Sequence, residues 1–139
     1  MAPSIHRAGV AWDGGEDGDV RAHRVLLGTR SVPASCALEF GGDETRANPE
    51  SLLVASLSGC HMLWFLDLAR RKGFEVDSYE DDAEGLLDGK RFSSVTLRPL
   101  VRWAGEAPEP EQVEALHESA QARCYVANSV DFPVAVEPS

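Results

Sequence analysis

The chain has 139 residues, of which 43% are hydrophobic and 26% are charged, and this balance excludes a disordered or low-complexity protein. The formal net charge of −10 repels phosphate backbones and anionic lipid, which argues against nucleic acid as a partner. The first residues lack the apolar run of a secretory signal, and no segment has the roughly 20 apolar residues of a membrane span. We therefore expect a cytoplasmic protein without a membrane partner, folded as a single domain over residues 1–139.

The first third of the sequence alternates short apolar runs with turn residues. Strands are predicted at residues 6–12, 19–27 and 34–40, and the glycine-rich stretch 14–18 is predicted to form a turn between the first two. This spacing is typical of an antiparallel meander.

A long helix is predicted to follow. Asn48 is a good N-cap, Pro49 suits the first helical position, and Gly73 suits the C-terminal end after a basic last turn. From residue 52 to residue 69 the segment is apolar or small on nearly every face, which is typical of a buried helix. A helix of about 25 residues is about 37 Å long, so we expect it to be wrapped by sheet or pressed against a second copy of itself.

The last part of the sequence predicts two long strands at residues 75–87 and 92–103, joined by an Asp88-Gly89 turn. A second helix is expected from Pro110, with Val113, Leu116, His117 and Ala120 at helical spacing, followed by a last strand at residues 132–136. The expected class is α+β.

Two of the three cysteines carry the main chemical hypothesis. An odd number of cysteines in a reducing compartment argues against structural disulfides, and no Cys/His spacing indicates a metal site. A lone thiol such as Cys60, inside a helix, is more often a packed core residue than a reactive one. Redox chemistry needs a second sulfur, and Cys124 is the candidate, because amides at the start of a following short helix would favour its thiolate. These residues alone leave the pairing open.

Two motifs stand out: NPESLL at residues 48–53, continued by ASLSGCHML at residues 55–63, and ARCYVANS at residues 122–129. Both resemble the OsmC/Ohr family of osmotically induced and organic-hydroperoxide-resistance proteins. The CHMLWFL segment at residues 60–66 is similar to an OsmC-like branch of that family. Together the motifs and the expected element order cover nearly the whole chain.

The resemblance implies an OsmC-like fold, with antiparallel sheets wrapped around the central helix in an intertwined homodimer. It further implies a peroxidase that reduces organic hydroperoxides, with hydrogen peroxide as a further candidate substrate. Cys60 would then be the peroxidatic thiol, Cys124 the resolving thiol, and Glu50 the acid that partners the family's catalytic arginine. No bound cofactor is expected, but an external dithiol reductant is, and a lipoyl-type dithiol is one candidate.

The family's arginine is missing from its expected place, because the turn at residues 13–18 has no basic residue. Arg21, His23 and Arg24 on the following segment are the candidates to orient the substrate; on a strand, Arg21 and His23 would share one face and Arg24 the other. Glu50 is ten residues from Cys60, about 15 Å along one helix, so it would serve that thiol only from a broken first turn or from a partner chain.

His61, Trp64 and Phe65 are the candidates to line a pocket at Cys60 for a bulky apolar peroxide, although a core or interface role is the favoured interpretation of His61 and packing that of the two aromatic residues. Cys36 is expected to be an inert strand residue. Two alternatives to a peroxidase stay open: a non-catalytic dimer that binds a small apolar ligand, and a redox sensor that uses the Cys60–Cys124 disulfide.

Overall fold

The computed structural model describes residues 2–139 and divides into two compact units. The first unit ends at Leu52 and the second is Leu53–Ser139, so the boundary falls inside a helix. The expectation of a single domain stays a prediction.

The first unit contains a three-stranded antiparallel sheet in the order β1-β2-β3. Its strands are β1 (Gly9–Ala11), β2 (His23–Leu27) and β3 (Arg30–Ala34), and a 3-10 turn, η1 (Leu38–Phe40), follows them. The meander predicted from the sequence is therefore confirmed, although the strands are shorter than expected.

Two of the predicted strand boundaries were wrong for local reasons. Residues 19–22 form a turn instead of extending β2, because the Asp19 carboxylate accepts a hydrogen bond from the Arg21 backbone N–H at 2.9 Å. The third strand was placed at residues 34–40 but ends at Ala34. A two-residue turn at Gly28-Thr29, where Gly28 has a φ of 60°, returns the chain at once, so that β3 starts at Arg30.

The long helix α1 (Pro49–Arg71) begins and ends where the sequence predicted. The Asn48 side chain caps it by accepting a hydrogen bond from the Ser51 backbone N–H at 2.8 Å. After the basic last turn, Gly73 adopts a φ of 82° and the Phe74 N–H bonds back to the Ala69 carbonyl at 3.0 Å. The capping residues therefore account for both ends of the helix.

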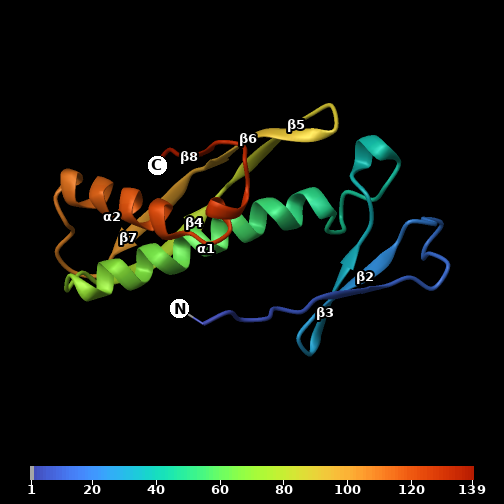
Figure 1. Ribbon diagram of the computed structural model, residues 1–139, viewed down its shortest axis with the longest axis horizontal. Helices are drawn as coiled ribbons and strands as arrows, with labels where there is room; N and C mark the ends of the chain where they lie inside the picture. The colour runs from blue at the N-terminus through green and yellow to red at the C-terminus, as the bar shows by residue number, and fades with distance from the viewer. Residues whose placement is uncertain (1) are drawn as a thin grey trace. The chain divides into compact units, whose positions relative to one another are not determined.

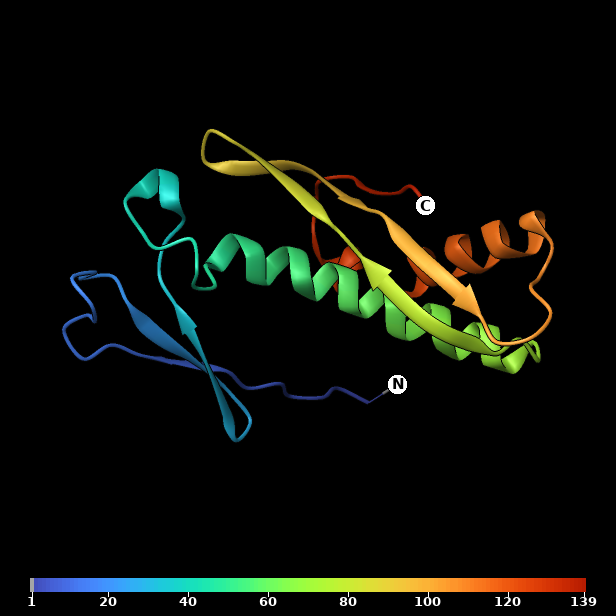
Figure 2. The same ribbon diagram turned by 180° about the vertical axis from the view of Figure 1, so that it is seen from behind.

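The second unit is built on one long, interrupted hairpin, which Figures 1 and 2 show from opposite sides as it runs beside α1. Strand β4 (Val76–Asp81) pairs with β7 (Pro99–Trp103), and β5 (Glu84–Asp88) pairs with β6 (Arg91–Leu97), all antiparallel. The two long strands predicted from the sequence are confirmed, with a break in each. At that break the Asp81 carboxylate accepts a hydrogen bond from the Arg98 backbone N–H at 2.6 Å.

The helix α2 (Pro110–Arg123) leads through a 3-10 turn, η2 (Ala127–Ser129), to β8 (Val134–Val136), which pairs parallel to β6. Helices α1 and α2 lie on the same face of the hairpin, in front of it in Figure 1 and behind it in Figure 2. The mixed α+β architecture with antiparallel sheets is as predicted.

Two apolar clusters hold the second unit together. Around one end of α1, Phe65 and Leu68 pack with Leu116 of α2 and with side chains of β4 and β7; around the other, Leu57 packs with Val95 and Leu97 of β6. The other face of α1 is open, and Leu63 is 65% exposed. The expectation that no segment is apolar enough for a membrane span was wrong, because α1 qualifies by length and composition; the core helix of a soluble protein passes the same test.

Candidate functional site

Two cysteines far apart in the sequence come together in the second unit. Cys60 lies in the middle of α1 and is partly buried, whereas Cys124 directly follows α2 and is 1% exposed. Both are free thiols, and the Cys60 thiol lies near enough to Cys124 to influence its pKa. The long hairpin and its packing against both helices bring the two thiols within reach of each other.

The two thiols differ in how readily they ionise. Burial raises the pKa of the Cys124 thiol to about 11, and the neighbouring Cys60 thiol acts in the same direction. The Ala127 N–H donates to the Cys124 sulfur at 3.4 Å and opposes the shift, but burial outweighs it. The backbone amides of Ala127 and Val126 do lower the pKa of the Cys124 thiol, as expected, but burial reverses the net effect. The Cys124 thiol is therefore protonated at pH 7.

The aromatic residues next to Cys60 in sequence have two different environments. Trp64 meets Tyr125 edge-on, with ring centroids 5.7 Å apart, and the Arg123 guanidinium lies over the Trp64 ring at 5.7 Å. Phe65 is fully buried, and its ring centroid lies 4.3 Å from that of His117. Trp64 thus contacts the segment that carries Cys124, whereas Phe65 is a core residue.

His61 and His117 form a buried pair that the sequence did not reveal. His61 Nε2 and His117 Nδ1 are 3.0 Å apart, and the rings are stacked with 4° between their planes. Burial lowers the pKa of both imidazoles, to about 4 for His117, so both are neutral at pH 7. The only sequence signal was the helical spacing that put His117 on the buried face of α2.

Asp81 is a second polar residue without a predicted role. Besides the Arg98 N–H, its carboxylate accepts a hydrogen bond from the Ser58 hydroxyl of α1 at 2.5 Å. Its charge opposes the lowering of the His61 pKa, and it adds to the effect of burial in raising the pKa of Tyr79. Asp81 therefore ties α1 to the break in the hairpin, through a residue two positions before Cys60.

The three residues predicted to orient a substrate lie in the first unit and have partners there. The Arg21 guanidinium donates to the Gly41 carbonyl at 3.4 Å, His23 Nδ1 lies 2.8 Å from the Arg21 carbonyl oxygen, and Arg24 pairs with Asp13 at 3.6 Å. Because Arg21 precedes β2, the expected arrangement of Arg21 and His23 on one strand face was wrong. Their role in orienting a substrate stays a prediction.

Glu50 is the second residue of α1, and its Oε2 is buried without a hydrogen-bond partner. Cys60 is ten residues further along the same unbroken helix, about 15 Å along its axis. The first turn of α1 is intact, so a broken first turn is not the route from Glu50 to a Cys60 site.

Arg46 is a basic residue that the sequence analysis missed. Its guanidinium reaches the turn at residues 13–18 and pairs with Glu16 at 2.8 Å, while it lies 3.9 Å from Asp43. Its side chain is only 13% exposed. The turn that has no arginine of its own thus receives one from thirty residues further along the chain, and no local sequence pattern indicates this.

Cys36 was expected to be a strand residue, but this was wrong, because β3 ends at Ala34 and Cys36 follows it. Its thiol lies 3.5 Å from the Phe40 carbonyl oxygen. Within residues 2–139, no group of three or more His, Cys, Asp or Glu side chains is arranged to hold a metal ion.

A family model described as OsmC-like protein matches residues 41–139. The chain belongs to the OsmC-like family. The resemblance inferred from the NPESLL and cysteine motifs is therefore confirmed. No curated protein matches the sequence of this OsmC-like protein at a significant level.

Solved structures of OsmC-like and organic hydroperoxide resistance proteins match nearly the whole chain. An OsmC-like protein of unknown function from Vibrio cholerae O1 biovar eltor str. N16961 is 32% identical, with a TM-score of 0.88 over 99% of this chain and 100% of the other. An organic hydroperoxide resistance protein OsmC from Legionella pneumophila is 20% identical (TM-score 0.70, 99% and 98% covered). The organic hydroperoxide resistance protein OhrB of Bacillus subtilis is 21% identical (TM-score 0.66, 98% and 100% covered). At these last two identities the likeness shows the shared fold.

Proposed function

We propose that this OsmC-like protein is a thiol-dependent peroxidase that reduces organic hydroperoxides to alcohols. The observation that carries the proposal is the meeting of a partly exposed Cys60 with a buried Cys124. The family's organic hydroperoxide resistance proteins from Legionella pneumophila and Bacillus subtilis support the substrate class.

The different environments of the two thiols support one distribution of roles. Cys60 is the thiol that a peroxide reaches, and its thiolate attacks the terminal oxygen of ROOH; the O–O bond breaks, and the alkoxide takes a proton to leave as ROH. The Cys124 thiol then attacks the Cys60 sulfenic acid, forms the disulfide and releases water. An external dithiol reduces the disulfide, restores both thiols and is itself oxidised to a disulfide.

Thiol counting tests the chemistry. After reduction, one equivalent of cumene hydroperoxide should convert the Cys60 and Cys124 thiols to a disulfide that peptide mass spectrometry identifies. The Cys124→Ser variant should stop at a Cys60 sulfenic acid that dimedone traps, and the matched control Cys36→Ser should behave as wild type. Cys60 and Cys124 thiols that both survive prolonged exposure would refute the proposal.

Turnover separates an enzyme from the redox sensor of the same fold. With excess dihydrolipoamide as reductant, a peroxidase consumes many equivalents of cumene hydroperoxide per chain, and hydrogen peroxide tested in parallel ranks the substrates. Disulfide formation without repeated consumption would favour the sensor instead. Because the thiols must be reduced again after each cycle, a reducing compartment such as the cytoplasm suits this chemistry.

The working form that we propose is a homodimer in which a second copy covers the open face of α1. This helix has a mean hydropathy of 1.6 over its most apolar window, yet only 28% of that window is buried in the chain. Exposed apolar area of this kind marks an interaction surface. In such a dimer Glu50 of one copy would act at Cys60 of the other.

Mixed dimers test this arrangement. Neither Glu50→Gln nor Cys60→Ser alone should have full activity, but chains mixed and allowed to exchange should regain about a quarter of the wild-type rate. This fraction is expected because half of the dimers are mixed and each of those has one complete site. Mixing that restores nothing would place Glu50 and Cys60 in the same chain's site or leave Glu50 without a role.

A further inference from the structure

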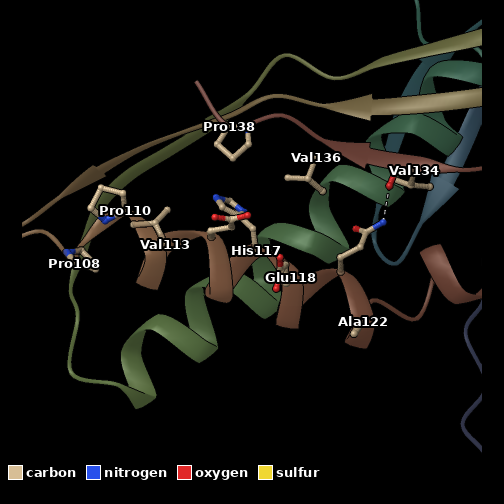
Figure 3. Close-up of a pocket in the computed structure, with 11 residues that line it drawn as sticks. Pro108, Pro110, Val113, His117, Glu118, Ala122, Val134, Val136 and Pro138 are labelled. Carbon is tan, nitrogen blue, oxygen red and sulfur yellow. Dashed lines mark hydrogen bonds between the residues drawn. The ribbon is translucent and has the colours of Figure 1, made fainter.

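A cavity of about 830 Å³ lies between α2 and the C-terminal segment. Figure 3 shows Val134, Val136 and Pro138 on one side of it and side chains of α2, among them Val113 and His117, on the other. Its volume is within the range of about 300–1,000 Å³ that is usual for small-molecule sites. All of its walls belong to the second unit.

One wall of this α2–β8 cavity carries an unmatched polar group. His117 lines the cavity, is 4% exposed, and has no hydrogen-bond partner at Nε2. Buried ring nitrogens are normally paired, because burying an unpaired polar atom costs free energy. The rest of the wall is largely valine and proline, so we expect a ligand to form its hydrogen bond with the His117 imidazole.

The tautomer of the histidine pair sets whether that nitrogen donates or accepts, and the Gln121 side chain favours one tautomer. The Gln121 side-chain N–H donates to the Val134 carbonyl at 2.8 Å, which leaves the Gln121 Oε1 as an acceptor near His61. This oxygen does not reach direct hydrogen-bond geometry, but it favours a proton on His61 Nδ1. His61 Nε2 then accepts from His117 Nδ1–H, and the neutral His117 is left with a lone pair on Nε2.

We propose that the α2–β8 cavity binds an uncharged, mainly apolar alcohol whose hydroxyl group donates a hydrogen bond to His117 Nε2. A hydroxyl group is a small, uncharged hydrogen-bond donor and can therefore pair with the His117 Nε2 lone pair. The exposed carboxylates of Glu114 and Glu118, which also line the cavity, disfavour a carboxylate ligand. The inference rests on the cavity and the histidine pair and is independent of the peroxidase proposal.

The test uses the full chain with 1-octanol, its methyl ether, which lacks the donor, and octanoate. Binding is followed by NMR through backbone amide shifts of α2 and β8 and through the His117 side-chain nitrogens. We expect saturable binding of 1-octanol with a shift at His117 Nε2, and binding of the ether and of octanoate at least about fivefold weaker.

Two variants with matched controls locate the site. Ala122→Trp fills one end of the cavity and should weaken 1-octanol binding at least tenfold, whereas Ala115→Trp, on an exposed α2 position away from the cavity, should not. His117→Phe keeps an aromatic ring against Phe65 and should erase the preference for the alcohol over the ether.

The binding measurements on the wild-type protein can refute the proposal by themselves, so the test does not depend on whether the variants fold. Absence of saturable 1-octanol binding, equal affinity for the alcohol and its ether, or equal loss in both tryptophan variants would each refute it. If a second copy of the chain occupies the cavity instead, 1-octanol will not bind and only Ala122→Trp will change the oligomeric state.

Discussion

Lowering the pH should destabilise this protein through the buried His61–His117 pair. In the unfolded chain an imidazole takes up a proton near pH 6.5, whereas in the folded chain His117 does so only near pH 4. Between these values the unfolded state binds more protons, so the free energy of unfolding falls as the pH falls through this window. Above pH 6.5 the contribution of His117 to the free energy of unfolding is fully present, and below pH 4 it is fully lost.

The magnitude follows from the difference between the two pKa values. At about 1.36 kcal/mol per pKa unit, His117 alone accounts for at most about 3 kcal/mol between pH 6.5 and pH 4. His61 acts in the same direction, because burial lowers its pKa too. A loss of this size is a large part of the roughly 5–15 kcal/mol that typically holds a domain folded.

The assay is urea unfolding followed by far-UV circular dichroism at fixed protein concentration and at several values between pH 7.5 and pH 4. His117→Phe keeps the stacking on Phe65 but leaves His61 Nε2 without a partner, so at pH 7.5 we expect a loss of about 1–3 kcal/mol. Towards pH 4 the difference from wild type should shrink or reverse. The exposed His6→Gln is the control and should follow wild type. Parallel pH profiles for wild type and His117→Phe would refute the reasoning.

Three further predictions concern local structure and are measured by the same unfolding assay at pH 7.5. Asn48→Ala removes the cap of α1 and should cost about 0.5–2 kcal/mol, whereas a cost near zero would mean that the helix start is held by packing. Gly59→Ala should be neutral or stabilise by up to about 1 kcal/mol, because nothing lies within 4 Å of the added Cβ; a clear loss would indicate a close neighbour there. Gly42→Ala should cost about 1–3 kcal/mol, because its Cβ would lie 1.8 Å from the Cys36 carbonyl oxygen, and wild-type stability would contradict that contact.

The site was only partly visible in the sequence. Cys60 and Cys124 were found through motifs, but their different ionisation follows from burial, which spacing along the chain does not encode. The His61–His117 pair escaped prediction because its two residues lie on different helices, and which faces of two helices meet is set by packing. Arg46 escaped for a similar reason, since its partner Glu16 is thirty residues away.

The sequence by itself determined the local features of this protein. The ends of α1 followed from Asn48, Pro49 and Gly73, the hairpin turn from Asp88-Gly89, and the start of α2 from Pro110, because caps and turns depend on a few neighbouring residues. Only the tertiary structure decided which thiol is buried, which histidines pair and where a cavity opens. These depend on how long-range packing excludes water from some side chains and leaves others exposed, and a pattern read along one chain does not contain that information.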